Sequence, residues 1–127
     1  MTAETLPEAL AATIDTARNA ERDLFGGLDE SILVRPIPEG DWSPKDFQGH
    51  LTAWKSRQAD RFAAEREGRE LPPMMGDQEE DAINAALRLT RIDWAWGAIV
   101  NEADAVTERL VDEIRQAVPM CCALRSA

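Results

Sequence analysis

A well-marked helix start near the middle of the chain constrains the fold more than any other sequence feature. Ser43 is a favoured N-cap residue, Pro44 suits the first helical position, and Asp46 completes a capping-box pattern that the helix dipole favours. The pattern predicts a helix from residue 43 to about residue 68. The stretch 33–41 before it contains two prolines and a glycine, so it is predicted to be an extended connector.

Hydrophobic spacing and helix stop signals predict three more helices. The first begins near Pro7 and ends at the pair Gly26-Gly27. A short helix, opened by a second capping-box pattern, runs from residue 77 to residue 87 or 89. The last helix holds an apolar face over 92–114 and is stopped by Pro119. No segment alternates with the period of a strand, so the predicted fold class is all-α, an up-and-down bundle of three long helices and one short helix.

Length and charge narrow the class of protein. The 127 residues are enough for one hydrophobic core, so a single domain is predicted over 1–127, with 119–127 as an irregular tail. The net charge of -10 opposes the phosphate neutralisation that drives binding to nucleic acid, and it disfavours anionic membranes. No apolar run approaches ~20 residues, so we expect no membrane span, no signal peptide and a cytoplasmic location. The adjacent Cys121 and Cys122 match no zinc spacing and receive no role.

His50 is the only histidine in the chain. Counting ~100° per residue from Trp54 places Phe47, His50, Leu51 and Gln58 on the same half of the second helix. This half is predicted to face neighbouring helices, with Trp54 in the core or in the wall of a pocket. A buried imidazole there needs partners.

Two interpretations of His50 remain open, a metal ligand and a hydrogen-bonded core histidine. A transition metal needs several donors. The donors that the sequence offers are Glu21, Asp46, Glu80, Asp81 and the two tail cysteines. Because no second ligand is recognisable, we favour the core histidine.

A polar strip on the same helix suggests a small anion pocket. Arg57 and Arg61 follow His50 by seven and eleven residues and recur on its edge of the predicted inner face. The pocket would use an arginine to clamp a carboxylate and His50 to orient it or to move a proton. The alternative, which we favour, is an ion pair between Glu21 and one of these arginines across the helix interface. Asn84 in the short helix either binds a ligand or ties a loop, and we favour the loop.

Two motifs accompany this order of helices: Trp42-Ser43-Pro44-Lys45-Asp46 with His50-Leu51 and Trp54, and Asp81-Ala82-Ile83-Asn84-Ala85. Over about residues 5 to 118 the chain resembles the DinB-like helical-bundle superfamily, which includes the mycothiol-dependent maleylpyruvate isomerases and the ClbS/DfsB proteins. Members are four-helix bundles, and many bind a divalent metal through a histidine at the place of His50 and two ligands on a final helix. The sequence has no counterpart to that helix, so only His50 is carried over.

The resemblance implies a DinB-like small-molecule-binding or stress-related protein without a complete metal-dependent catalytic centre and without a cofactor. One alternative is a metal-dependent enzyme similar to the thiol transferases and isomerases of that family, with His50 and carboxylates holding zinc or nickel. Another is a structural homo-oligomer. Three of four bundle helices would leave an apolar trough open, so we expect a homodimer in which a second copy fills it. The predicted ligand is a small anion.

Overall fold

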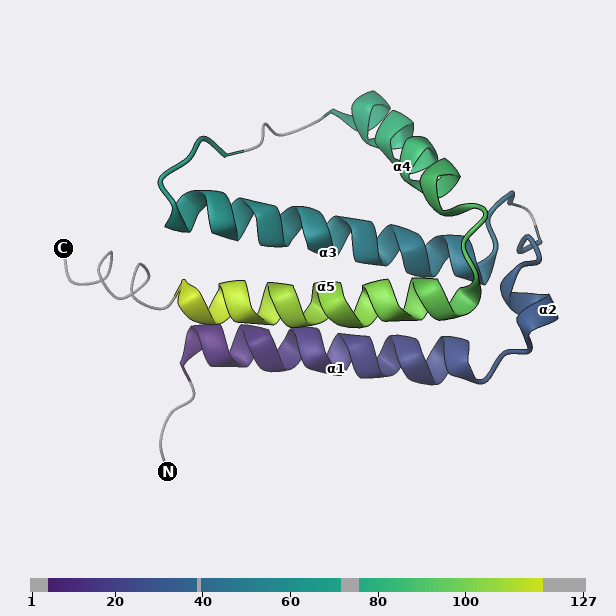
Figure 1. Ribbon diagram of the computed structural model, residues 1–127, viewed down its shortest axis with the longest axis horizontal. Helices are drawn as coiled ribbons and strands as arrows, with labels where there is room; N and C mark the ends of the chain where they lie inside the picture. Colours follow the sequence, from purple (N-terminus) through teal and green to yellow (C-terminus); the bar gives the residue numbers. More distant parts are fainter. Residues whose placement is uncertain (1–4, 39, 72–75, 118–127) are drawn as a thin grey trace.

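The computed structural model describes residues 5–38, 40–71 and 76–117, and its regular structure in these ranges is entirely helical (Figure 1). This confirms the all-α prediction. The helices are α1 Leu6–Gly26, α2 Glu30–Leu33, α3 Pro44–Arg66, α4 Asp77–Arg91 and α5 Trp96–Gln116.

The three long helices lie side by side, with α5 between α1 and α3 (Figure 1). α4 lies on the outer side of α3 and is inclined to it, and none of its described side chains is fully buried. No helix in the described part of the chain is both long enough and apolar enough to cross a membrane.

The capping signals explain where two long helices begin. The Ser43 side chain accepts a hydrogen bond from the Asp46 amide, and the Asp46 carboxylate accepts one from the Ser43 amide, so the predicted capping box is confirmed. Thr5 caps α1 in a similar way through the Glu8 amide. The cap predicted at Asp77 is wrong, because Asp77 is already helical and Gly76 is the N-cap of α4.

The short helix α2 interrupts the connection from α1 to α3 and was not predicted. Its last residue, Leu33, is almost completely buried. One turn of helix therefore anchors the connection at the end of the bundle where α1 ends and α3 begins (Figure 1).

Small side chains dominate the hydrophobic core. The apolar face predicted for the last helix is confirmed at Ile99, Ala103, Leu110 and Ile114, which are buried. One part of the core, beside which Ile14 and Phe62 pack, is formed by Ala11, Ala59, Leu110, Val111 and Ile114. Nearer the α2 end, Phe25 meets Trp96 edge-on at 6.0 Å between ring centroids.

The predicted inward face of α3 is wrong for three of its residues. Phe47, Leu51 and Gln58 are exposed, whereas His50 and Trp54 are half-buried at the edge of α4. The buried face of α3 consists mainly of small and polar residues, namely Lys45, Gln48, Gly49, Thr52, Ala53, Ala59, Ala63 and Ala64. Close helix packing favours small residues, so the largest hydrophobic side chains do not mark the buried face of this helix.

Candidate functional site

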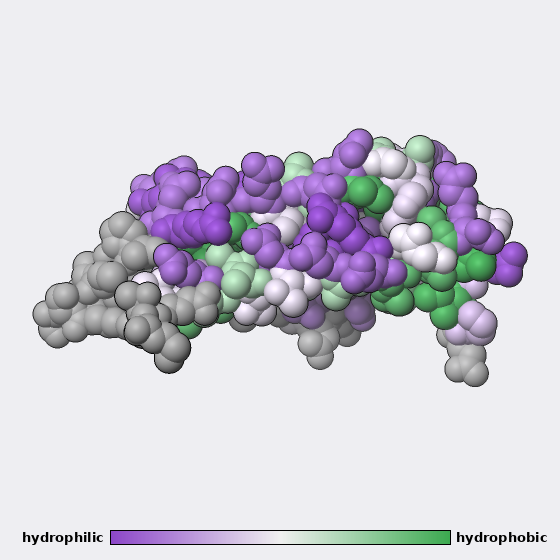
Figure 2. Space-filling view, turned by 90° about the horizontal axis from the view of Figure 1, so that it is seen from below, coloured by the Kyte–Doolittle hydropathy of each residue, from purple (hydrophilic) through white to green (hydrophobic). Residues whose placement is uncertain are grey.

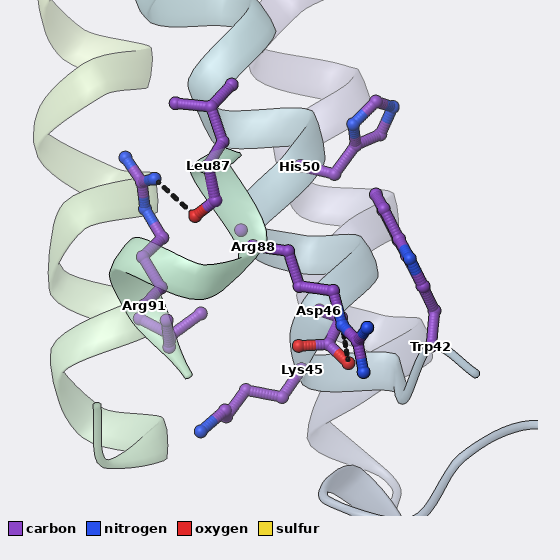
Figure 3. Close-up of a pocket in the computed structure, with 9 residues that line it drawn as sticks. Trp42, Lys45, Asp46, His50, Leu87, Arg88 and Arg91 are labelled. Atoms are coloured by element: carbon purple, nitrogen blue, oxygen red, sulfur yellow. Dashed lines mark hydrogen bonds and ion pairs between the residues drawn. The ribbon is translucent and has the colours of Figure 1, made fainter. Parts of the chain in front are cut away.

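The imidazole of His50 packs between two indole rings. The His50 centroid lies 5.3 Å from that of Trp42 in edge-on geometry (Figure 3). It lies 6.3 Å from that of Trp54, also edge-on. The Nδ1 atom is buried and has no hydrogen-bond partner among the described residues. Burial lowers the pKa of His50, and a side-chain hydrogen bond with Asn84 only partly opposes this shift. Burial therefore favours the neutral form of the imidazole.

The space beside His50 is small. It measures about 10 Å³ and lies between the N-terminal half of α3 and the end of α4, where Leu87, Arg88 and Arg91 face Lys45 and Asp46 (Figure 3). A volume of this size corresponds to about one water molecule. It has no room for an organic ligand. We therefore assign His50 a structural role, in which its ring packs against Trp42 and Trp54.

Cationic side chains fasten the end of α4 to the bundle. The Lys45 ammonium, which is buried, donates hydrogen bonds of 2.9 and 2.8 Å to the carbonyl oxygens of Ile92 and Trp94. Arg88 lies 3.2 Å from the Asp46 carboxylate. These contacts place positive charge at the C-terminal end of α4, where the helix dipole favours it.

Arg91 adds the contact between α4 and α5. Its guanidinium donates two hydrogen bonds to the Glu102 carboxylate, at 2.7 and 2.9 Å. The same guanidinium lies over the ring of Trp94, 5.3 Å from its centroid. Trp94 thus precedes α5, and its ring lies against Arg91 at the end of α4.

A larger cleft of about 240 Å³ opens farther along α3 and α4, and it shares Leu87 and Arg91 with the space beside His50. Trp54, from α3, lines it. The indole Nε1 of Trp54 donates a 2.7 Å hydrogen bond to the Asn84 side-chain oxygen, and the Arg57 guanidinium lies 5.5 Å from the indole centroid. The remaining lining residues are Ala53, Ser56, Asp60 and Ile83. The cleft therefore combines apolar and charged lining residues.

The structure brings together four of the six residues predicted for a ligand pocket. His50, Trp54, Arg57 and Asn84 lie at the contact of α3 with α4. Arg61, also on α3, is half-buried and does not line the cleft. Glu21 lies elsewhere, at the contact of α1 with α3.

The cation that pairs with Glu21 across the helix interface is Lys55, at 2.6 Å, so the predicted pairing of Glu21 with Arg57 or Arg61 is corrected. The Gln48 amide donates to the same carboxylate at 2.8 Å. Arg18, only 3% exposed, lies 3.5 Å from Glu21 and donates to Gln48 at 3.1 Å. Sequence reasoning missed this polar network. The available signal was the position of Arg18, seven residues from both Ala11 and Phe25 on the buried stripe of α1.

No group of three or more histidine, cysteine or acidic side chains that could hold a metal ion occurs within the described part of the chain. Cys121 and Cys122 lie outside the described residues. The metal-ligand role of His50 stays a prediction.

Comparison of the chain with protein-family models, with curated proteins and with solved structures finds no match. Membership of the DinB-like superfamily therefore stays a prediction.

Proposed function

We propose that the protein binds a small carboxylate-bearing molecule with a flat apolar body in the cleft between α3 and α4. The observation that carries the proposal is the pairing of Trp54 with Arg57 in the wall of a cleft of about 240 Å³. Ligand sites commonly combine an apolar lining with a few polar groups that set the orientation of the ligand. The volume lies below the usual range for drug-sized ligands, so it favours a small molecule.

Each wall of the cleft has a role in this proposal. The indole of Trp54 and the side chains of Ile83 and Leu87 would cover the apolar body of the ligand. The Arg57 guanidinium, which lies beside the indole, would attract the carboxylate and donate a charged hydrogen bond to it. Asn84 fixes the indole by accepting its N–H, so the wall is already in place before binding.

His50 would act as a positioning residue under this proposal. Its ring contacts Trp54. It lines the small space next to the cleft but does not line the cleft itself. A DinB-like small-molecule-binding protein, as predicted from the sequence, agrees with such a site. Neither the binding of a carboxylate nor the support of Trp54 requires a metal ion.

Calorimetry and Trp fluorescence with benzoate test the proposal, with the uncharged benzamide as the matched ligand. We expect benzoate to bind, to alter the indole emission and to raise the melting temperature. Benzamide should bind at least about tenfold more weakly, since that factor corresponds to about 1.4 kcal/mol for the missing charged hydrogen bonds.

Two variants and one control assign binding to the cleft. Arg57→Gln and Trp54→Leu should each weaken benzoate binding, whereas Arg22→Gln, on the surface of α1, should leave it unchanged. Equal binding of benzoate to Arg57→Gln and to the parent protein would refute the proposed site. Failure of all small aromatic and aliphatic carboxylates at millimolar concentration would refute the proposed ligand class.

The homodimer predicted from the sequence belongs to the same proposal. Its support is the number of large apolar side chains left exposed on α1, α2 and the start of α3, a feature that soluble monomers seldom show over a continuous area. Figure 2 shows such residues gathered at the end of the molecule that carries α2.

A further inference from the structure

Exposed uncharged residues recur along α1 and α3 at the spacing of a second packing surface. We call this surface the α1–α3 face; it consists of Leu10, Ala17, Leu24, Phe47, Leu51 and Gln58. The three residues on α1 are seven positions apart, and those on α3 follow at intervals of four and seven, as in helices that pack along their whole length. The exposed fraction is 65% for Leu24, 40% for Phe47 and 39% for Leu51.

Contacts between α1 and α3 show that the two rows lie on one side of the bundle. Glu21 on α1 meets Gln48 and Lys55 on α3. Leu24 is three residues from Glu21, and Leu51 is three residues from Gln48 and four from Lys55, so each leucine is a helical neighbour of this contact. Because α5 covers the opposite side of both helices, the two leucines face away from the core.

We infer that a second copy of this chain packs on the α1–α3 face, so that α1 and α3 of two copies form a four-helix contact. The lengths of the helices agree with this assignment. α1 and α3 contain 21 and 23 residues, so each is at least ~30 Å long, and the two helices together with the side-chain contacts between them span at least ~20 Å. The resulting footprint of ~600 Å² per copy approaches the ~800 Å² per partner of a standard stable interface.

Charge favours a second copy as the occupant of this face. The chain carries a net charge of -10, yet none of the six residues of the α1–α3 face is charged. Of the charged groups beside them, Glu21 and Lys55 pair with each other, and the exposed Glu65 follows Gln58 by seven residues at the far end of the row. Two copies can therefore meet along the part of this face that precedes Glu65 without bringing unpaired carboxylates together, and each presents to the other the apolar side chains that it needs to cover.

This inference rests on the homodimer proposed above and adds the surface that forms it. The cleft between α3 and α4 is lined by other residues, so ligand binding and dimer formation are separable. A variant that dissociates the dimer should still bind benzoate.

Sedimentation velocity and light scattering of the full chain test the inference. The parent protein should have twice the mass of one chain. The double variant Leu24→Glu with Leu51→Glu should be a monomer, because it places two carboxylates on the contact surface and removes two of its large apolar side chains. The matched control is Leu89→Glu, which changes a leucine of 63% exposure on α4 and should leave the dimer intact. Circular dichroism checks that all variants remain helical.

The dependence on salt gives a second measurement. Added salt should strengthen the dimer, because it screens the repulsion between two chains of high negative charge and leaves the apolar contact unaffected. A dimer that persists in the double variant, or that salt dissociates, would place the interface elsewhere. A monomeric parent protein would overturn the dimer itself but would leave the proposed ligand site unaffected.

Discussion

The guanidinium of Arg18 donates a 2.9 Å hydrogen bond to Asp104 from a position that is almost completely buried between the helices. The same carboxylate oxygen accepts a 2.7 Å hydrogen bond from Arg22, which is exposed. Burial disfavours the charge of Asp104, but the hydrogen bonds from Arg22 and Arg18 outweigh it, and the pKa of Asp104 is lowered. One carboxylate oxygen thus accepts hydrogen bonds from a buried arginine and from an exposed arginine.

Replacing the buried arginine should cost far more stability than replacing the exposed one. Arg18→Ala removes the hydrogen bonds to Asp104 and Gln48 and leaves their oxygens in a partly dry interface, so we expect a loss of roughly 2–3 kcal/mol in the free energy of unfolding. Arg22→Ala should lose less than about 1 kcal/mol, as exposed ion pairs do. Urea unfolding of both variants makes the comparison, and equal losses would contradict the assigned role of burial.

Acidification should destabilise the protein through His50. The pKa of His50 in the folded protein is below its ordinary value of 6.5, so the unfolded chain takes up the proton first as the pH falls. Stability should therefore decrease from pH 7.5 to pH 5.5. The contribution of His50 is expected to be below about 1 kcal/mol, because the ring is partly open to solvent.

The variant His50→Gln, which does not titrate, isolates this effect. Its free energy of unfolding should change less than that of the parent protein over the same pH interval. Asp104 does not affect this comparison. Because its pKa is lowered from the ordinary value of 3.8, its contribution to stability is lost only at a pH below the tested interval. An identical pH dependence in both proteins would show that His50 does not contribute.

Replacing Gly49 by alanine should not give the gain in stability that this substitution usually gives inside a helix. A methyl group at Gly49 would lie 3.2 Å from the Cδ atom of Arg91, whose guanidinium is held by Glu102. A methyl group at Gly97 would meet nothing within 4 Å. We expect Gly97→Ala to gain up to about 1 kcal/mol and Gly49→Ala to gain less or to lose stability. Thermal unfolding of the two variants tests this order.

Loss of the Lys45 ammonium should loosen the end of α4 selectively. Lys45→Met removes the hydrogen bonds to the carbonyls of Ile92 and Trp94, so hydrogen exchange should become faster in α4 and in the segment 92–95. α1 should keep its protection. Lys55→Met is the control, since it changes a lysine of the same helix that pairs with Glu21. Faster exchange throughout the chain in Lys45→Met would indicate global destabilisation.

The sequence predicts helix boundaries better than helix faces in this protein. Ser43 carries a local hydrogen-bonding signal that needs no tertiary contact, and the structure has the capping box that it predicts. The buried face of α3 depends on its partners. Because Gln48 and Thr52 are buried while Phe47 and Leu51 are exposed, counting hydrophobic residues selects the opposite face.

The candidate site was predicted in part for the same reason. Trp54, Arg57 and Asn84 come together because α4 lies across α3, a placement that helical phase alone does not give. Glu21 was placed correctly at a helix interface, but its partner Lys55 was missed. Pairing across helices depends on axial register, and no short motif encodes register.

The buried charges between α1 and α3 have a consequence for how this bundle holds its shape. α1 and α3 meet through long polar side chains, whereas the close helix packing in the bundle is that of each helix against α5. A slip of one turn, ~5.4 Å, would move Arg18 and Glu21 away from Gln48 and Lys55 and leave ions in a dry interior. The ionic cluster therefore favours a single axial alignment of α1 relative to α3.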